Sequence, residues 1–122
     1  MFNKVILIGR LGKNAEVKTA QNKKEFVVLS VATGESWKND KGEYETRTEW
    51  HCVYAWSNLS NFAKTLQKGQ MITVEGKIKY REVEEELEGK TFRHTIAEIH
   101  ATGFKRLSKV EVPDDSMDGA EE

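Results

Sequence analysis

The alternation of hydrophobic and polar positions along the chain predicts mostly β-structure. Residues 4–11 form a short apolar segment rich in β-branched side chains, which is typical of a largely buried strand. Gly9 and Gly12 interrupt this segment, and glycine within a strand pattern indicates a bulge or a sharp bend. A polar turn at residues 21–24 precedes a second strand, which we expect over residues 25–37.

The middle of the chain predicts a hairpin followed by one helix. Residues 39–42 read Asn-Asp-Lys-Gly, a turn with glycine where a positive φ is needed, and a third strand is expected over 43–56. Apolar positions then recur at i, i+3, i+4 and i+7, which predicts a helix over 58–67 with one buried face. Ser57 is its expected N-cap, and Gly69 lies just past its end.

The last part of the pattern predicts two further strands and a tail. The strands are expected over 71–81 and 90–104, with an acidic loop over 82–89 between them. Residues 108–122 are acidic and free of aromatic side chains, which predicts a disordered tail. The chain is therefore expected to form one domain, residues 1–107, followed by this tail.

The order of these elements indicates a fold class. Five strands with one helix between the third and the fourth form the element order of the oligonucleotide-binding (OB) barrel, an all-β fold with one helix. Closure into a barrel removes exposed strand edges, and the two glycine bends suit a strand that must curl. An open five-stranded sheet covered by the helix is the alternative.

Composition indicates the cellular compartment of the protein and the charge of its binding surface. The chain has 122 residues, one cysteine and no stretch of about 20 apolar residues, so we expect a cytoplasmic protein without a membrane segment or an intrachain disulfide. Residues 1–81 carry 14 basic and 8 acidic side chains, whereas residues 82–122 carry 5 and 12. This division predicts a basic working surface with an acidic appendage.

The sequence does not predict an enzyme. Gly89 begins a tripeptide like the end of a phosphate-binding loop, but Glu84 stands where that motif needs glycine. His94, Glu98 and His100 share a face of the last strand, and we interpret them as polar strand residues rather than as metal ligands. With no complete catalytic set, a small hydrolase or metal enzyme is the least favoured reading, and no cofactor is expected.

Aromatic and basic side chains together suggest nucleic-acid binding. Trp37 has polar neighbours, and Trp50, Tyr54 and Trp56 have the same parity along one strand. Rings on one strand face make a platform on which any base can stack, whereas the alternative is that these rings form the core of the sheet. The residues alone leave both interpretations open. The candidate phosphate contacts are Lys4, Arg10, Lys18, Lys38, Arg47, Lys64, Lys77, Lys79 and Arg81.

Five sequence blocks, in order between Phe2 and Leu107, resemble the bacterial-type single-stranded DNA-binding protein family. The blocks are residues 3–12, 16–17, 32–37, 48–51 and 68–78.

The resemblance implies an OB-fold subunit of a homotetramer that wraps single-stranded DNA without sequence preference during replication, recombination and repair. It implies that Trp37, Trp50 and Trp56 stack on bases, although the family usually has Phe at the last position. It places His51 near the subunit interface.

Two features depart from the family pattern. Val83 stands where the family often has an aromatic stacker, and its carboxylate neighbours repel phosphates, so Tyr80 is the candidate for a partial substitute. The tail ends in residues 119–122 without the Pro-Phe tip through which the family docks replication and repair proteins. Either the chain is truncated, or this recruitment is altered or absent. A primosomal or recombination-accessory OB protein and an RNA-binding OB module remain the alternatives.

Overall fold

The structure is a computed structural model that describes residues 1–108 of the chain. Within those residues it contains six strands and one short helix. The elements are β1 (Val5–Leu11), β2 (Glu16–Thr19), β3 (Glu25–Lys38), β4 (Tyr44–Trp56), α1 (Asn58–Ala63), β5 (Met71–Leu87) and β6 (Lys90–Arg106).

The strands close into a barrel. Neighbouring strands hydrogen-bond in the order β1-β5-β6-β4-β3-β2, and β1 pairs in addition with β3 through Arg10 and Leu11. This last pairing closes a ring of five strands, β1, β5, β6, β4 and β3, and leaves the short β2 beside β3. The closed barrel confirms the predicted OB fold and excludes the open sheet.

The core of the barrel is built from alternate positions of each strand. Val27, Leu29 and Val31 of β3 and Val53 and Ala55 of β4 have no exposed surface. Further buried positions of β1, β5 and β6 complete the core, and α1 packs against β3, β4 and β6. Since alternate side chains of a strand point to opposite faces, the remaining positions of β3 and β4 point away from the core.

Close approach of β1 to β3 explains one of the predicted glycine bends. A Cβ at Gly9 would collide with the backbone carbonyl group of Ala32 and would lie 3.0 Å from a methyl group of Val31. Only a residue without a side chain lets the two strands meet here, so Gly9 makes barrel closure possible.

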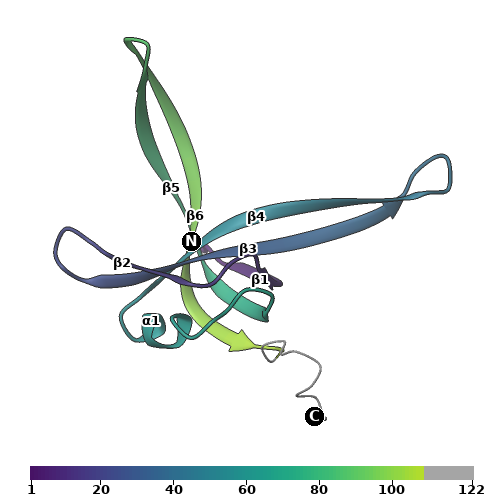
Figure 1. Cartoon of the computed structure of the whole chain (residues 1–122), viewed down its shortest axis with the longest axis horizontal. Coiled ribbons are helices and arrows are strands. Elements are labelled where there is room, and N and C mark those ends of the chain that lie inside the picture. Colours follow the sequence, from purple (N-terminus) through teal and green to yellow (C-terminus); the bar gives the residue numbers. More distant parts are fainter. Residues whose placement is uncertain (109–122) are drawn as a thin grey trace.

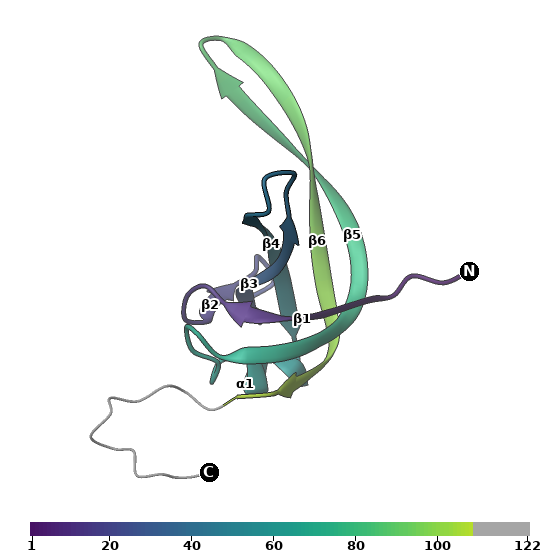
Figure 2. The same cartoon turned by 90° about the vertical axis from the view of Figure 1, so that its right-hand side faces the viewer.

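Two hairpins, β3–β4 and β5–β6, extend well beyond the barrel in different directions (Figures 1 and 2). The predicted acidic loop over 82–89 is wrong, because β5 continues to Leu87 and pairs in register with β6 up to Lys90. Glu88 and Gly89 alone form the turn, with φ values of 52° and 77°. Two successive positive φ values suit a tight hairpin turn. The carboxylates of this hairpin are solvated on both faces, so they do not prevent strand pairing.

The helix is shorter than predicted. α1 ends at Ala63 instead of residue 67, because the following backbone hydrogen bonds join residues three apart, as in Leu66 N–H to the Ala63 carbonyl at 3.1 Å. Leu66 is still buried, so this tighter turn satisfies the apolar periodicity. The predicted Ser57 cap is also wrong, since its φ is 55° and its side chain makes no capping hydrogen bond.

The carboxyl end of the described chain is attached to the barrel. Ser108 is fixed to the barrel, because its Oγ accepts a hydrogen bond of 2.8 Å from the Met71 amide. This contact lies one residue beyond the predicted domain boundary. The predicted disordered tail falls almost wholly on residues 109–122, which lie outside the described residues. No helix within residues 1–108 has the length and apolarity needed to cross a bilayer.

Candidate nucleic-acid interface

The aromatic side chains of β4 face away from the barrel core. Trp50, Tyr54 and Trp56 alternate with the fully buried Val53 and Ala55. Their shared parity, predicted from the sequence, therefore places them on the outer face, and the interpretation of these rings as core is wrong. Trp50 is the most open of them, with 61% of its surface exposed.

Four rings stack across the outer face of three strands. Phe26 of β3 lies between Trp56, at a centroid distance of 4.5 Å, and Tyr54, at 5.8 Å. Tyr54 in turn stacks on His100 of β6 at 5.2 Å with the planes only 10° apart. Sequence reasoning missed Phe26 and His100, because this ring column depends on cross-strand register rather than on the pattern of any one strand.

Trp37 does not lie on the same face as Trp50. The register between β3 and β4 is unbroken and pairs Ala32 with Trp50 but Trp37 with Glu45. Strand alternation then places Trp37 on the opposite face of the β3–β4 hairpin. Because this part of the hairpin stands clear of the barrel, Trp37 is still 43% exposed.

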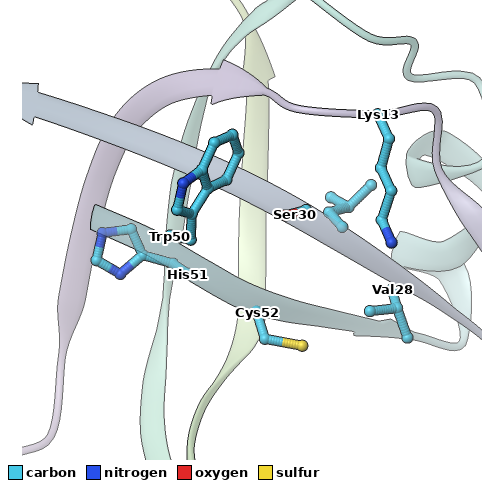
Figure 3. Close-up of a pocket in the computed structure, with 7 residues that line it drawn as sticks. Lys13, Val28, Ser30, Trp50, His51 and Cys52 are labelled. Carbon is cyan, nitrogen blue, oxygen red and sulfur yellow. The ribbon is translucent and has the colours of Figure 1, made fainter. Parts of the chain in front are cut away.

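Trp50 packs against Gly12 and borders a hollow. Figure 3 shows side chains that line this hollow. A Cβ at Gly12 would lie 2.7 Å from Cη2 of the indole, so the absence of a side chain leaves room for the ring. The Gly12 amide donates a hydrogen bond of 2.9 Å to the Ser30 carbonyl, which holds the segment after β1 against β3. The hollow has a volume of about 180 Å³ and includes Val28, Ser30 and Cys52 in its lining.

Most of the predicted phosphate contacts already have a polar partner. Five of them form ion pairs: Lys4 with Glu75 at 3.5 Å, Lys18 with Glu16 at 3.9 Å, Arg47 with Glu49 at 3.5 Å, Lys64 with Glu25 at 2.6 Å, and Arg81 with Glu98 at 2.6 Å. Arg10 donates to the Gly69 carbonyl at 2.9 Å, and the Lys38 ammonium lies 5.7 Å from the centroid of the Tyr44 ring.

Only some of these cations lie beside the ring column. The register pairs Lys18 with Phe26 at one end and Lys77 with His100 at the other. Lys79 and Arg81 follow Lys77 on the same face of β5. The structure thus groups four of the nine candidates with the rings, namely Lys18, Lys77, Lys79 and Arg81. The other five lie elsewhere: Lys4, Arg10, Lys38, Arg47 and Lys64.

Glu98 is a buried carboxylate on this outer face. It is 5% exposed, and it accepts hydrogen bonds from Arg81 Nε at 2.6 Å and from His100 Nε2 at 3.2 Å. Burial by itself would raise the pKa of Glu98, but the bonds from Arg81 and His100 hold it below 4.5. Burial, together with Cys52 and Glu98, raises the pKa of Tyr54 to about 12. Arg81 therefore compensates Glu98 and is not a free cation.

The remaining sequence candidates occupy separate places. His51 is half-buried, and its Nε2 lies 2.8 Å from Thr33 Oγ1. Tyr80 is 68% exposed but lies on the face of β5 opposite Lys79.

The three side chains considered as metal ligands do not converge. His94 pairs with Glu85 on the projecting hairpin at 3.5 Å, whereas Glu98 binds His100. Within residues 1–108, no three metal-ligating side chains come together.

The closed barrel with an outward aromatic face defines an OB-fold protein with a candidate nucleic-acid interface. A profile described as "Single-strand binding protein family" matches residues 2–107. The chain belongs to this family.

Relatives of known name are similar over part of their length. The chain is 42% identical over 81 residues to the single-stranded DNA-binding protein of Neisseria meningitidis serogroup A, covering 66% of this chain and 47% of the relative. It is 36% identical over 81 residues to "Single-stranded DNA-binding protein 1" of Chlorobaculum tepidum, covering 66% and 50%. The chain spans about half the length of the curated relatives it matches.

Solved structures share the fold. The Plasmodium falciparum SSB in complex with ssDNA superposes with a TM-score of 0.72 and 25% identity, over 88% of this chain and 96% of that one. The wild-type single-stranded DNA-binding protein of Thermus aquaticus gives a TM-score of 0.68 with 24% identity, over 88% and 50%.

The buried carboxylate makes stability depend on pH. Because the pKa of Glu98 is lowered in the folded state, its contribution is present above pH 4.5 and is lost as the pH falls through the folded-state value. We expect Glu98→Gln to lower the free energy of unfolding at pH 7 by about 1–3 kcal/mol, with a difference from wild type that shrinks under acid. Urea denaturation at several pH values measures this.

The matched control is Glu75→Gln, which removes a half-exposed carboxylate paired with Lys4. This change should stay within about 0.5 kcal/mol of wild type. Equal stability of Glu98→Gln and wild type at pH 7, or a difference that grows under acid, would contradict the role given to Glu98.

Proposed function

We propose that this protein binds single-stranded DNA without sequence preference and protects it during replication, recombination and repair. The observation that carries the proposal is the outward aromatic face of β4 on the barrel of a chain that belongs to the single-strand binding protein family. The relatives are named as single-stranded DNA-binding proteins, and the Plasmodium falciparum structure contains ssDNA. The protein acts by binding rather than by catalysis.

Base stacking provides the sequence-independent part of this function. Every base has a π-face, so the rings of Trp37, Trp50 and Trp56 accept any sequence. Trp37 and Trp50 lie on opposite faces of the β3–β4 hairpin, so a strand that contacts both passes around this hairpin.

Phosphate contacts require the cations to exchange partners. The ion pairs of Lys18 and Arg47 join half-exposed side chains, and such surface pairs contribute about 0–1 kcal/mol, so a phosphate displaces the carboxylate at little cost. Arg81 is different, because its removal would leave the buried Glu98 uncompensated. We therefore assign the phosphate contacts beside the ring column to Lys18, Lys77 and Lys79.

We propose that the protein assembles as a homotetramer in the cytoplasm, where it coats DNA and meets replication and repair proteins. The outer edge of β1 supports self-association, because β1 pairs with β3 only through Arg10 and Leu11. On the same strand Ile6 and Ile8 are each 59% exposed, and an exposed apolar edge strand favours pairing with another chain. His51 is assigned to the subunit interface from the family resemblance.

Replacement of each tryptophan tests the stacking proposal. Trp37→Ala, Trp50→Ala and Trp56→Ala should each weaken binding of oligothymidine by about 1–3 kcal/mol, because each removes one stacked base. Fluorescence titration of the remaining tryptophans measures the affinity. Phe92→Ala is the control, since this exposed ring lies on the acidic β5–β6 hairpin.

Wild-type affinity in all three tryptophan variants would refute stacking on these rings. A wild-type protein that prefers oligouridine to oligothymidine would instead favour the RNA-binding alternative.

Replacement of His51 tests the assembly. A bulkier ring in His51→Tyr should shift the protein toward smaller species, with an apparent stability that depends on protein concentration. Sedimentation velocity over a range of concentrations measures the distribution. His94→Tyr makes the same change on the exposed hairpin and should leave the assembly intact. A tetramer that persists at low micromolar His51→Tyr would place the interface elsewhere.

A further inference from the structure

The hollow beside Trp50 contains a lysine that lies outside the predicted set of phosphate contacts. Lys13 lies two residues after the end of β1 and contributes to the lining of the hollow together with Val28 and Trp50. In Figure 3, Trp50 and Lys13 stand on two sides of this hollow. Lys13 also forms an ion pair of 3.1 Å with Glu16, in which the two side chains are 59% and 42% exposed.

Small side chains create the hollow. Ser30 and Cys52 are direct cross-strand partners on the outer face, and Cys52 lies between the larger Trp50 and Tyr54 along β4. Because Gly12 has no side chain, the Trp50 indole has room to pack at the edge of the hollow. A volume of about 180 Å³ is close to that of a cavity of roughly 150 Å³ that holds one benzene molecule, so the hollow has room for one flat ring.

The chemistry of the lining matches a nucleotide. The indole of Trp50 and Val28 provide apolar surface for a base. The Ser30 hydroxyl and the Cys52 thiol add polar groups to the lining, and the Lys13 ammonium provides a positive charge for a phosphate. A phosphate can replace Glu16 as the partner of Lys13, because an ion pair between two exposed side chains contributes little to stability.

We propose that this hollow binds one nucleotide of single-stranded DNA, with the base against Trp50 and above Ser30 and Cys52, and the phosphate on Lys13. The proposal rests on the proposed DNA-binding function and adds a defined nucleotide subsite to it. Lys13 thereby joins the phosphate contacts, and Cys52 serves as the small side chain that keeps the subsite open.

The first test removes the cation. Lys13→Ala should weaken binding of oligothymidine and reduce the slope of log K against log salt concentration by about 0.7, the value for one lost phosphate contact on a single strand. Lys90→Ala makes the same charge change at the turn of the acidic β5–β6 hairpin and should keep the wild-type slope. Titrations at several salt concentrations give both slopes.

The second test fills the hollow. Cys52→Phe should weaken binding about tenfold, because it excludes one stacked base and tenfold corresponds to about 1.4 kcal/mol. The control is Thr91→Phe, which adds a ring of the same size at an exposed position of the acidic β5–β6 hairpin and should bind like wild type. Thermal melting shows whether each variant is folded, and if Cys52→Phe does not fold, the exposed Lys13 decides the question alone.

The outcomes separate this proposal from the function on which it rests. A wild-type salt slope in Lys13→Ala, or wild-type affinity in folded Cys52→Phe, would overturn the subsite while DNA binding by the wild type stands. A wild-type protein that does not bind oligothymidine would overturn the proposed function and the subsite together.

Discussion

Inward packing of one face of β3 and β4 is the constraint on which the rest of the structure depends. Val27, Leu29, Val31, Val53 and Ala55 lose all exposure to form the centre of the barrel. Because strand side chains alternate, this burial forces every intervening side chain outward. The outer positions carry rings, small polar groups and the hollow beside Trp50 instead of a second apolar core. The same packing that stabilises the fold therefore creates the candidate nucleic-acid interface.

The β5–β6 hairpin has cations near the barrel and carboxylates toward its tip. Next to the ring column, the buried Glu98 takes up the charge of Arg81, so Lys77 and Lys79 are the cations of β5 that remain for phosphates. Farther along the same hairpin the glutamates of residues 82–88 dominate, and they repel a phosphate backbone. The proposed path of a DNA strand therefore runs over the barrel and the β3–β4 hairpin.

The sequence predicted the parts of the fold that local pattern controls. Strand alternation predicted the shared parity of Trp50 and Trp56, which follows from the two-residue period, and the order of strands and helix along the chain predicted the OB barrel. The predicted loop after Arg81 is wrong, because pairing with β6 outweighs the low strand propensity of glutamate. The stacking of Phe26 on Trp56 and the position of Lys13 beside the hollow depend on which strands are neighbours, which no single segment encodes.

The central claim is that single-stranded DNA lies on the outer face of β3 and β4. Ultraviolet crosslinking of the full-length protein to oligothymidine, followed by mass-spectrometric mapping of the linked peptides, tests this most directly. We expect crosslinks in the peptides that contain Trp50 and Trp56, with further links near Lys13. Crosslinks confined to the acidic β5–β6 hairpin, or to the apolar edge of β1, would contradict it.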